Sequence, residues 1–245
     1  RYKVSLPVNG AAVALEGLVP PAVAEVLALP GAFTAADEDW PETRPGCCMQ
    51  ISQGEWAKLL LRMLDNGMAA IYPEEVLPRW HGKVVTAGIF GVPKAGGKVR
   101  LIVDRRWKNS MECTLLDAMT RVGHGPGTVE FEEVKRLIRL PHGVMFGDLI
   151  LRADDDLYIC LDDLMDYYYL LCWPGCMVTE GALGPPLETQ ELEALGVSVP
   201  VAGRMYACLR SPAMGDAKVP DIAQLVHQWL LRRRGLMPSD EWMQY

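Results

Sequence analysis

Residues 161–174 have the sequence Leu-Asp-Asp-Leu-Met-Asp-Tyr-Tyr-Tyr-Leu-Leu-Cys-Trp-Pro and follow an apolar run over residues 157–161. The run predicts a buried strand, which places Asp162 and Asp163 at its carboxyl end. Paired carboxylates at the tip of an apolar strand are costly unless cations neutralise them, and carboxylate oxygens are ligands that Mg²⁺ prefers. Two interpretations stay open: a metal-binding aspartate at the rim of a sheet, or a strand that ends in a solvated acidic turn.

Charge is distributed unevenly along the 245 residues. The net charge of −7 disfavours a protein that coats nucleic acid by bulk electrostatics. Residues 84–109 nevertheless contain six cations and one aspartate, whereas residues 148–166 contain seven aspartates and one arginine. The six cations are Lys94, Lys98, Arg100, Arg105, Arg106 and Lys108. This pattern suits a site that binds phosphate on one side and metal on the other, and ordinary charge scatter is the alternative.

The cysteines and the apolar runs constrain the cellular setting. Seven cysteines, with Cys172 and Cys176 lacking a second pair or a histidine at zinc spacing, favour a reducing compartment and no zinc site. We therefore expect an intracellular protein of the cytoplasm or nucleus, not a secreted one. No apolar run reaches 18 residues, so we expect no membrane span. Because residue 1 is arginine, we expect a fragment or a processed form.

Hydrophobic periodicity predicts three main helices, each with apolar side chains on one face. These helices are expected over residues 52–67, 128–140 and 215–234. Shorter helical segments are expected over residues 22–29, 74–80 and 187–195. The first main helix has a capping box, because Ser52 is followed three residues later by Glu55.

Alternating and apolar runs predict strands over residues 84–92, 99–104 and 204–209. A Gly-Gly turn joins the first two strands into a β-hairpin. Residues 181–200 are predicted to be a loop-rich insert around a short helix. Residues 1–46 are predicted to be a poorly defined extension, with a second unit over residues 47–245. Together these elements predict an α+β fold.

Basic residues flank and follow the turn of the predicted hairpin, where a flexible backbone can approach a ligand. Lysine supplies a point charge and arginine a planar fork, which are the groups that bind phosphate. Many surface hairpins carry lysines without binding a ligand, so the hairpin alone does not decide the function.

Three separated blocks together resemble the fingers and palm of reverse transcriptases of the retroelement type. The first block is Phe90-Gly91-Val92-Pro93-Lys94 followed by residues 97–106 and Asn109. It resembles the fingers hairpin of that family, in which a lysine and an arginine hold the triphosphate of the incoming nucleotide. The resemblance assigns this role to Lys94 and Arg100, with Lys98 as a third candidate.

The second block, residues 163–169, is similar to the first palm motif of the family. The resemblance implies that Asp163 is the catalytic residue that binds Mg²⁺. It places Asp166 beside the sugar and triphosphate, and Tyr168 at the aromatic position that blocks a ribose 2′-OH.

The third block contains Met214 and Gly215 in a turn and Gln224 in the following helix. It resembles the next palm motif, which contacts the templating base pair and the incoming nucleotide. The resemblance covers about residues 50–231 and implies a polymerase-like fingers hairpin and helices with a partial palm sheet.

The sequence departs from the family in one respect. The family has a further palm motif after the third block, with an aromatic residue, any residue and two aspartates, and no such motif follows here. The expected fold is therefore truncated before the hairpin that carries the aspartate pair. A two-metal site would then lack much of its ligand set.

The resemblance implies RNA-directed DNA synthesis on an RNA or DNA primer–template, with dNTPs and Mg²⁺, in the intact parent protein. We expect this polypeptide alone to give no primer extension. A first alternative is a non-catalytic remnant of a polymerase fold that binds nucleic acid or a protein partner. A second is a plain α/β domain in which Asp163 is only a strand-end residue.

Overall fold

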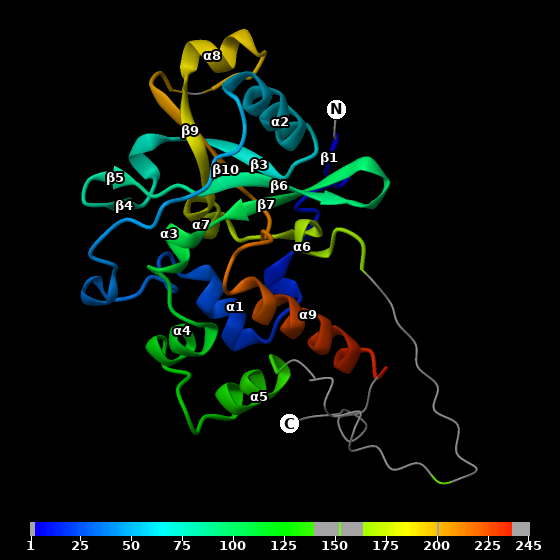
Figure 1. The fold of residues 1–245 in the computed structure, drawn as a ribbon. Helices are drawn as coiled ribbons and strands as arrows, with labels where there is room; N and C mark the ends of the chain where they lie inside the picture. The colour runs from blue at the N-terminus through cyan, green and yellow to red at the C-terminus, as the bar shows by residue number, and fades with distance from the viewer. Residues whose placement is uncertain (1–2, 140–151, 153–163, 200, 237–245) are drawn as a thin grey trace.

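The computed structural model describes residues 3–139, 152, 164–199 and 201–236, and in this part of the chain helices and small sheets are mixed (Figure 1). The α+β class predicted from the sequence is confirmed at that level. The predicted strand over residues 157–161 and the carboxylates of Asp162 and Asp163 lie outside the described residues.

The first sheet is built on the predicted hairpin. Strands β6 (Gly88–Lys94) and β7 (Lys98–Asp104) pair antiparallel through a short turn, η4 (Ala95–Gly97). In that turn Gly96 and Gly97 have φ angles of 73° and 69°, values that glycine adopts without steric cost. Strand β1 (Lys3–Ser5) pairs parallel with β7, so the strand order is β1-β7-β6.

The second sheet is antiparallel with the order β3-β10-β9. Its strands are β3 (Ala69–Pro73), β10 (Arg204–Leu209) and β9 (Ala182–Glu188). Strand β10 has the predicted bounds, whereas the prediction of a loop over the β9 residues was wrong. Pro185 and Pro186 suggest a loop in the sequence, but β9 is an edge strand whose register shifts in this region, and prolines are tolerated there.

Two short strand pairs complete the β structure of the described residues. Strand β2 (Val13–Ala14) pairs parallel with β8 (Leu171–Cys172), and β4 (Arg79–Trp80) pairs antiparallel with β5 (Lys83–Val84). The short helical segment predicted after β3 is the turn η3 (Glu74–Val76).

The three main helices form where periodicity predicts them. They are α2 (Gln53–Asp65), α5 (Val129–Leu137) and α9 (Val219–Arg233). The Ser52 hydroxyl caps α2 by accepting a hydrogen bond from the Glu55 amide at 3.4 Å. Helix α9 begins four residues later than predicted, because Gly215, at a φ of 112°, lies in a turn before it.

The remaining helices are short, and two of them, α1 and α8, were predicted. They are α1 (Pro21–Ala28), α3 (Arg106–Asn109), α4 (Leu115–Arg121), α6 (Tyr167–Leu170), α7 (Gly175–Val178) and α8 (Thr189–Ala194).

Two main apolar clusters hold these elements together. One lies among α1, α4, α5 and α9, which are grouped below the sheets in Figure 1. The other joins α2 to the faces of the two larger sheets. Leu15, Val23 and Leu27 are fully buried in the first cluster, so the segment predicted as an extension packs into the core. No helix within the described ranges is long and apolar enough to cross a membrane.

Candidate nucleotide-binding site

The two faces of the hairpin differ in character because successive side chains of a strand point to opposite sides. Ile89, Leu101 and Val103 are buried in the apolar cluster beneath α2. On the opposite side the register pairs Lys94 with Lys98 and sets Arg100 across from Val92. Paired residues of an antiparallel ladder share a face, so the three predicted phosphate ligands project together. We call Lys94, Lys98 and Arg100 the basic face.

All three side chains of the basic face are exposed. Among the residues that the structure describes, no aspartate or glutamate forms an ion pair with any of them. Unpaired cations attract anions and are free to form charge-assisted hydrogen bonds with phosphate oxygens.

A shallow pocket of about 370 Å³ lies along the same side of the hairpin, and we call it the hairpin pocket. Phe90 and Ile102, which are paired in the hairpin register, supply apolar surface to it. Gly215, from the third sequence block, lines the same pocket. Cations beside an apolar surface are an arrangement that suits a nucleotide, which has a charged end and a flat apolar base.

The third block is attached directly to the hairpin. The Val103 amide donates a hydrogen bond to the Met214 carbonyl at 3.0 Å, on the edge of β7 that β1 covers farther along. The Asn109 side chain donates to the Gly215 carbonyl at 2.9 Å and accepts from the Ala217 amide at 3.2 Å. Met214 and Gly215 are thereby fixed beside the residues that resemble the fingers hairpin.

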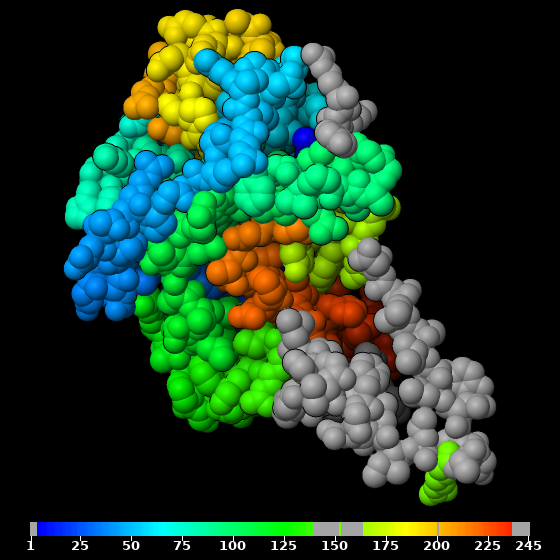
Figure 2. Space-filling model, in the orientation of Figure 1, coloured from blue at the N-terminus to red at the C-terminus, as the bar shows by residue number. Residues whose placement is uncertain are grey.

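The second block also reaches the hairpin, through Tyr169. Its hydroxyl donates a hydrogen bond to the Leu101 carbonyl at 3.0 Å, and burial raises the pKa of this tyrosine to about 12. Figure 2 shows the hairpin, the segment that begins at residue 164 and the turn before α9 side by side on one face of the molecule. The three blocks quoted for the resemblance thus meet around residues 101–109.

The other predicted residues of the second and third blocks contact elements other than the hairpin. Tyr168 is half-buried, and it packs against the apolar cluster of α1 and α9. Asp166 precedes α6 with a φ of 55°, and its carbonyl accepts from the Tyr169 amide at 2.9 Å. Gln224 is half-buried on α9, next to Ala223, whose carbonyl accepts from the Tyr167 hydroxyl at 3.0 Å.

A metal site is not formed by the described residues. Within these ranges no three His, Cys, Asp or Glu side chains lie close enough together to hold a metal ion. Asp163, the predicted ligand, lies outside them. Mg²⁺ binding therefore stays a prediction from the resemblance.

Part of the basic element predicted from the sequence has a different environment. Arg105 and Lys108 are buried and face carboxylates, in what we call the buried ion-pair network. The network contains the cations Arg105, Lys108 and Lys218 and the anions Glu112, Glu180 and Asp216. Arg106 is exposed and pairs with Asp104 at 2.6 Å. Arg105, Arg106 and Lys108 thus contact carboxylates of the chain itself, and the six cations of residues 84–109 do not share one environment.

Glu112 is the centre of the network. Its carboxylate lies 2.6 Å from the Lys218 ammonium, 3.1 Å from the Arg105 guanidinium and 3.8 Å from the Lys108 ammonium. Burial opposes ionisation of Glu112, but these three charges outweigh it and lower the pKa of the carboxyl to about 2. Arg105 also pairs with Asp216 at 3.3 Å, which ties the end of the hairpin to the turn before α9.

The sequence was compared with protein-family models, and none matches it. A comparison with curated proteins gave no match either.

Sequence reasoning missed two features of the site. Within the second block it selected Tyr168, whereas Tyr169 is the tyrosine that contacts the hairpin. Three consecutive tyrosines give no signal that separates them, because the short helix α6 decides which one points at β7. The charges of Arg44 and Lys83, which line a second pocket, also lie outside every block of the resemblance.

Proposed function

We propose that this chain is the fingers and part of the palm of a reverse-transcriptase-like polymerase. In the intact parent the reaction would be RNA-directed DNA synthesis, a template-directed nucleotidyl transfer. In this proposal Lys94, Lys98 and Arg100 hold the triphosphate of the incoming nucleotide. Met214 and Gly215 border the nucleotide, and Asp163 is the catalytic metal ligand.

The observation that carries the proposal is the register of the hairpin. It projects three cations from one exposed face, on the same side as a pocket that Phe90 and Ile102 line together with Gly215. Phosphoryl transfer needs mainly positioning and charge neutralisation, and cationic side chains supply both for a triphosphate. The network and the Asn109 hydrogen bonds hold the third block against the hairpin, which supports a site assembled from both.

A second candidate is a non-catalytic nucleic-acid-binding form of the same fold. Both candidates use the basic face, so a binding experiment tests what they share and a primer-extension assay separates them. We expect binding of primer–template without extension by this polypeptide, and robust extension with Mg²⁺ and dNTPs would contradict that expectation.

The test of the basic face is the double variant Lys94→Gln with Arg100→Gln. We expect its affinity for a fluorescently labelled primer–template at low salt to fall about tenfold. The slope of the logarithm of affinity against the logarithm of salt concentration should fall in magnitude by about 1–2, because two phosphate contacts are lost. Fluorescence anisotropy over a series of salt concentrations measures both quantities.

The matched control is Lys58→Gln with Lys135→Gln, which removes an exposed cation on α2 and a half-buried one on α5, each paired with a glutamate. The control changes net charge equally and should retain affinity within about twofold, because Lys58 and Lys135 already pair with glutamates. Equal losses in both double variants would show that bulk charge, not the basic face, determines binding.

A further inference from the structure

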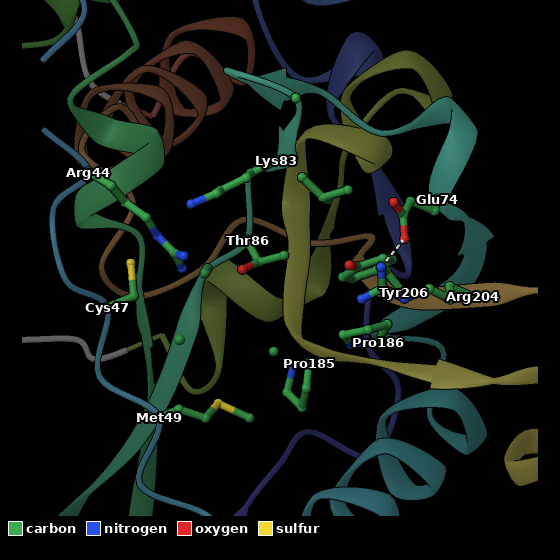
Figure 3. Close-up of a pocket in the computed structure, with 15 residues that line it drawn as sticks. Arg44, Cys47, Met49, Glu74, Lys83, Thr86, Pro185, Pro186, Arg204 and Tyr206 are labelled. Atoms are coloured by element: carbon green, nitrogen blue, oxygen red, sulfur yellow. Dashed lines mark ion pairs between the residues drawn. The ribbon is translucent and has the colours of Figure 1, made fainter. Parts of the chain in front are cut away.

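A second pocket of about 530 Å³ lies away from the basic face, and Figure 3 shows the residues that line it. Its walls come from β5 and the start of β6, from β9 and β10, and from residues 44–49. Cys47 and Met49 line this pocket, whereas Cys48, between them, lines the hairpin pocket. The two pockets therefore lie on opposite sides of one short segment.

That segment is fixed against β6. The Gln50 amide donates a hydrogen bond to the Ile89 carbonyl at 3.0 Å, and the Cys48 amide donates to the Asp104 carboxylate at 2.5 Å. A Cβ atom at Gly88 would lie 2.1 Å from the Cys48 carbonyl oxygen, so only glycine permits this approach. The wall between the pockets is held by backbone contacts.

Two cations meet in the second pocket. In Figure 3 the Arg44 and Lys83 side chains extend toward one another, and the Thr86 hydroxyl points toward the same space. The Arg44 guanidinium is held over the ring of Trp107, 3.9 Å from its centroid. Within the described part of the chain, neither Lys83 nor Arg44 has an ion-pair partner, and Thr86 has no side-chain hydrogen bond.

The one carboxylate among the residues that line this pocket does not offset these charges. Glu74 pairs with Arg79 at 3.1 Å and with Arg204 at 3.0 Å, so its charge is already neutralised. Like charges directed into one pocket repel each other unless an anion lies between them. A planar guanidinium, a point-charge ammonium and a hydroxyl donor together match the oxygens of a phosphate group.

We propose that the second pocket binds a phosphate ester, with Arg44 and Lys83 contacting the phosphate oxygens and Thr86 donating a hydrogen bond. The pocket volume is large enough for a nucleotide unit. Phosphate esters of this size occur in a nucleic-acid strand and in a free mononucleotide. This site is separate from the basic face and adds a second point of attachment for phosphate.

The experiment measures binding to the double variant Arg44→Gln with Lys83→Gln in two arms. In one arm, fluorescence anisotropy measures the binding of a labelled oligothymidylate of twelve nucleotides. In the other arm, calorimetry measures the binding of thymidine monophosphate. We expect affinity to fall about tenfold in at least one arm, and the arm that responds identifies the source of the phosphate. The control is the Lys58→Gln, Lys135→Gln variant, which should lose less than about twofold.

The same substitutions are repeated in a protein that already carries Lys94→Gln and Arg100→Gln. If the second pocket is a separate site, Arg44→Gln and Lys83→Gln cause the same fold loss in that background. This arm keeps the two proposals distinct, because the basic face can fail its test while the second pocket passes.

Arg44 contacts Trp107, so its substitution can also weaken the fold. The single variant Lys83→Gln, measured together with a thermal unfolding curve, separates lost binding from lost folding. Unchanged affinity in both arms would overturn the assignment.

Discussion

The basic face and the buried ion-pair network each contain three cations, yet their surroundings are opposite. Lys94, Lys98 and Arg100 are exposed, with no acidic partner among the described residues. Arg105, Lys108 and Lys218 have side chains that are at most 5% exposed, and each pairs with carboxylates. Only a few residues of chain separate Arg100 from Arg105, so position in the sequence does not predict which role a cation has.

The difference follows from the cost of removing a charge from water. A buried cation needs a carboxylate beside it, and three cations next to three carboxylates make the network neutral. An exposed cation keeps its hydration and can remain without a partner until a ligand arrives. The network therefore holds the hairpin against the turn before α9, whereas the basic face remains available for an anion.

The largest expected effect is from Glu112→Ala in the network. The substitution leaves three buried cations with one carboxylate fewer, which typically costs about 3–5 kcal/mol of unfolding free energy. Urea denaturation followed by circular dichroism measures the change. Glu132→Ala is the control, because Glu132 is exposed and pairs with Lys135 at 3.9 Å, and should cost less than about 0.5 kcal/mol. Similar losses for the two variants would break the contrast between buried and exposed pairs.

The next largest loss of unfolding free energy is expected from Gly215→Ala, because this substitution disturbs the turn that the network holds. Gly215 has a φ of 112°, and a Cβ there would lie 2.0 Å from the Val103 carbonyl oxygen. We expect a cost of about 2–4 kcal/mol from backbone strain and displacement together. Gly123→Ala isolates the strain, since Gly123 has a φ of 98° and open space around it. If thermal unfolding shows the same loss of stability for Gly215→Ala and Gly123→Ala, the close approach of Gly215 to β7 adds nothing to the cost of the substitution.

The network should also respond to acid. The folded-state pKa of Glu112 lies below its ordinary value of 4.5, at about 2, so its stabilising contribution is present above pH 4.5 and is lost as the pH falls toward 2. Between pH 4.5 and pH 3 we expect a loss of about 2 kcal/mol from this group. Urea midpoints at several pH values measure it. Glu112→Gln should flatten this part of the profile, and an unchanged profile would contradict the assignment.

The smallest expected change in stability is from the basic face. The triple variant Lys94→Gln, Lys98→Gln and Arg100→Gln should change the unfolding free energy by no more than about 0.5 kcal/mol, because the three side chains are exposed and have no ion pair with a described residue. Combined with weakened binding of primer–template, this result would separate a ligand-binding role from a structural one. A loss above about 2 kcal/mol in urea denaturation would show that these cations support the fold.

The sequence was sufficient for the elements whose signals are local. Alternation with a Gly-Gly turn located the hairpin, and one apolar face with the Ser52 cap located α2. Strand β9 was missed because its prolines are a loop signal that only its place at a sheet edge overrides.

The candidate site was predictable in part, for a related reason. The register of the hairpin follows from its sequence, so the common direction of Lys94, Lys98 and Arg100 could be expected. The partners of Arg105 and Lys108 could not, because Asp216 and Glu180 are distant in the chain and only tertiary packing brings them together. Charge counts over a window of sequence cannot separate neutralised cations from available ones.

Strand β1 gives the hairpin a vulnerability of its own. Its three residues pair with Lys98, Val99 and Arg100, and they cover part of an edge of β7 whose amide and carbonyl groups would otherwise be open. Uncovered edges recruit strands from other molecules. A protease that removes β1 would thus expose an unpaired edge of β7 next to the basic face. We expect the cleaved protein to self-associate through this edge.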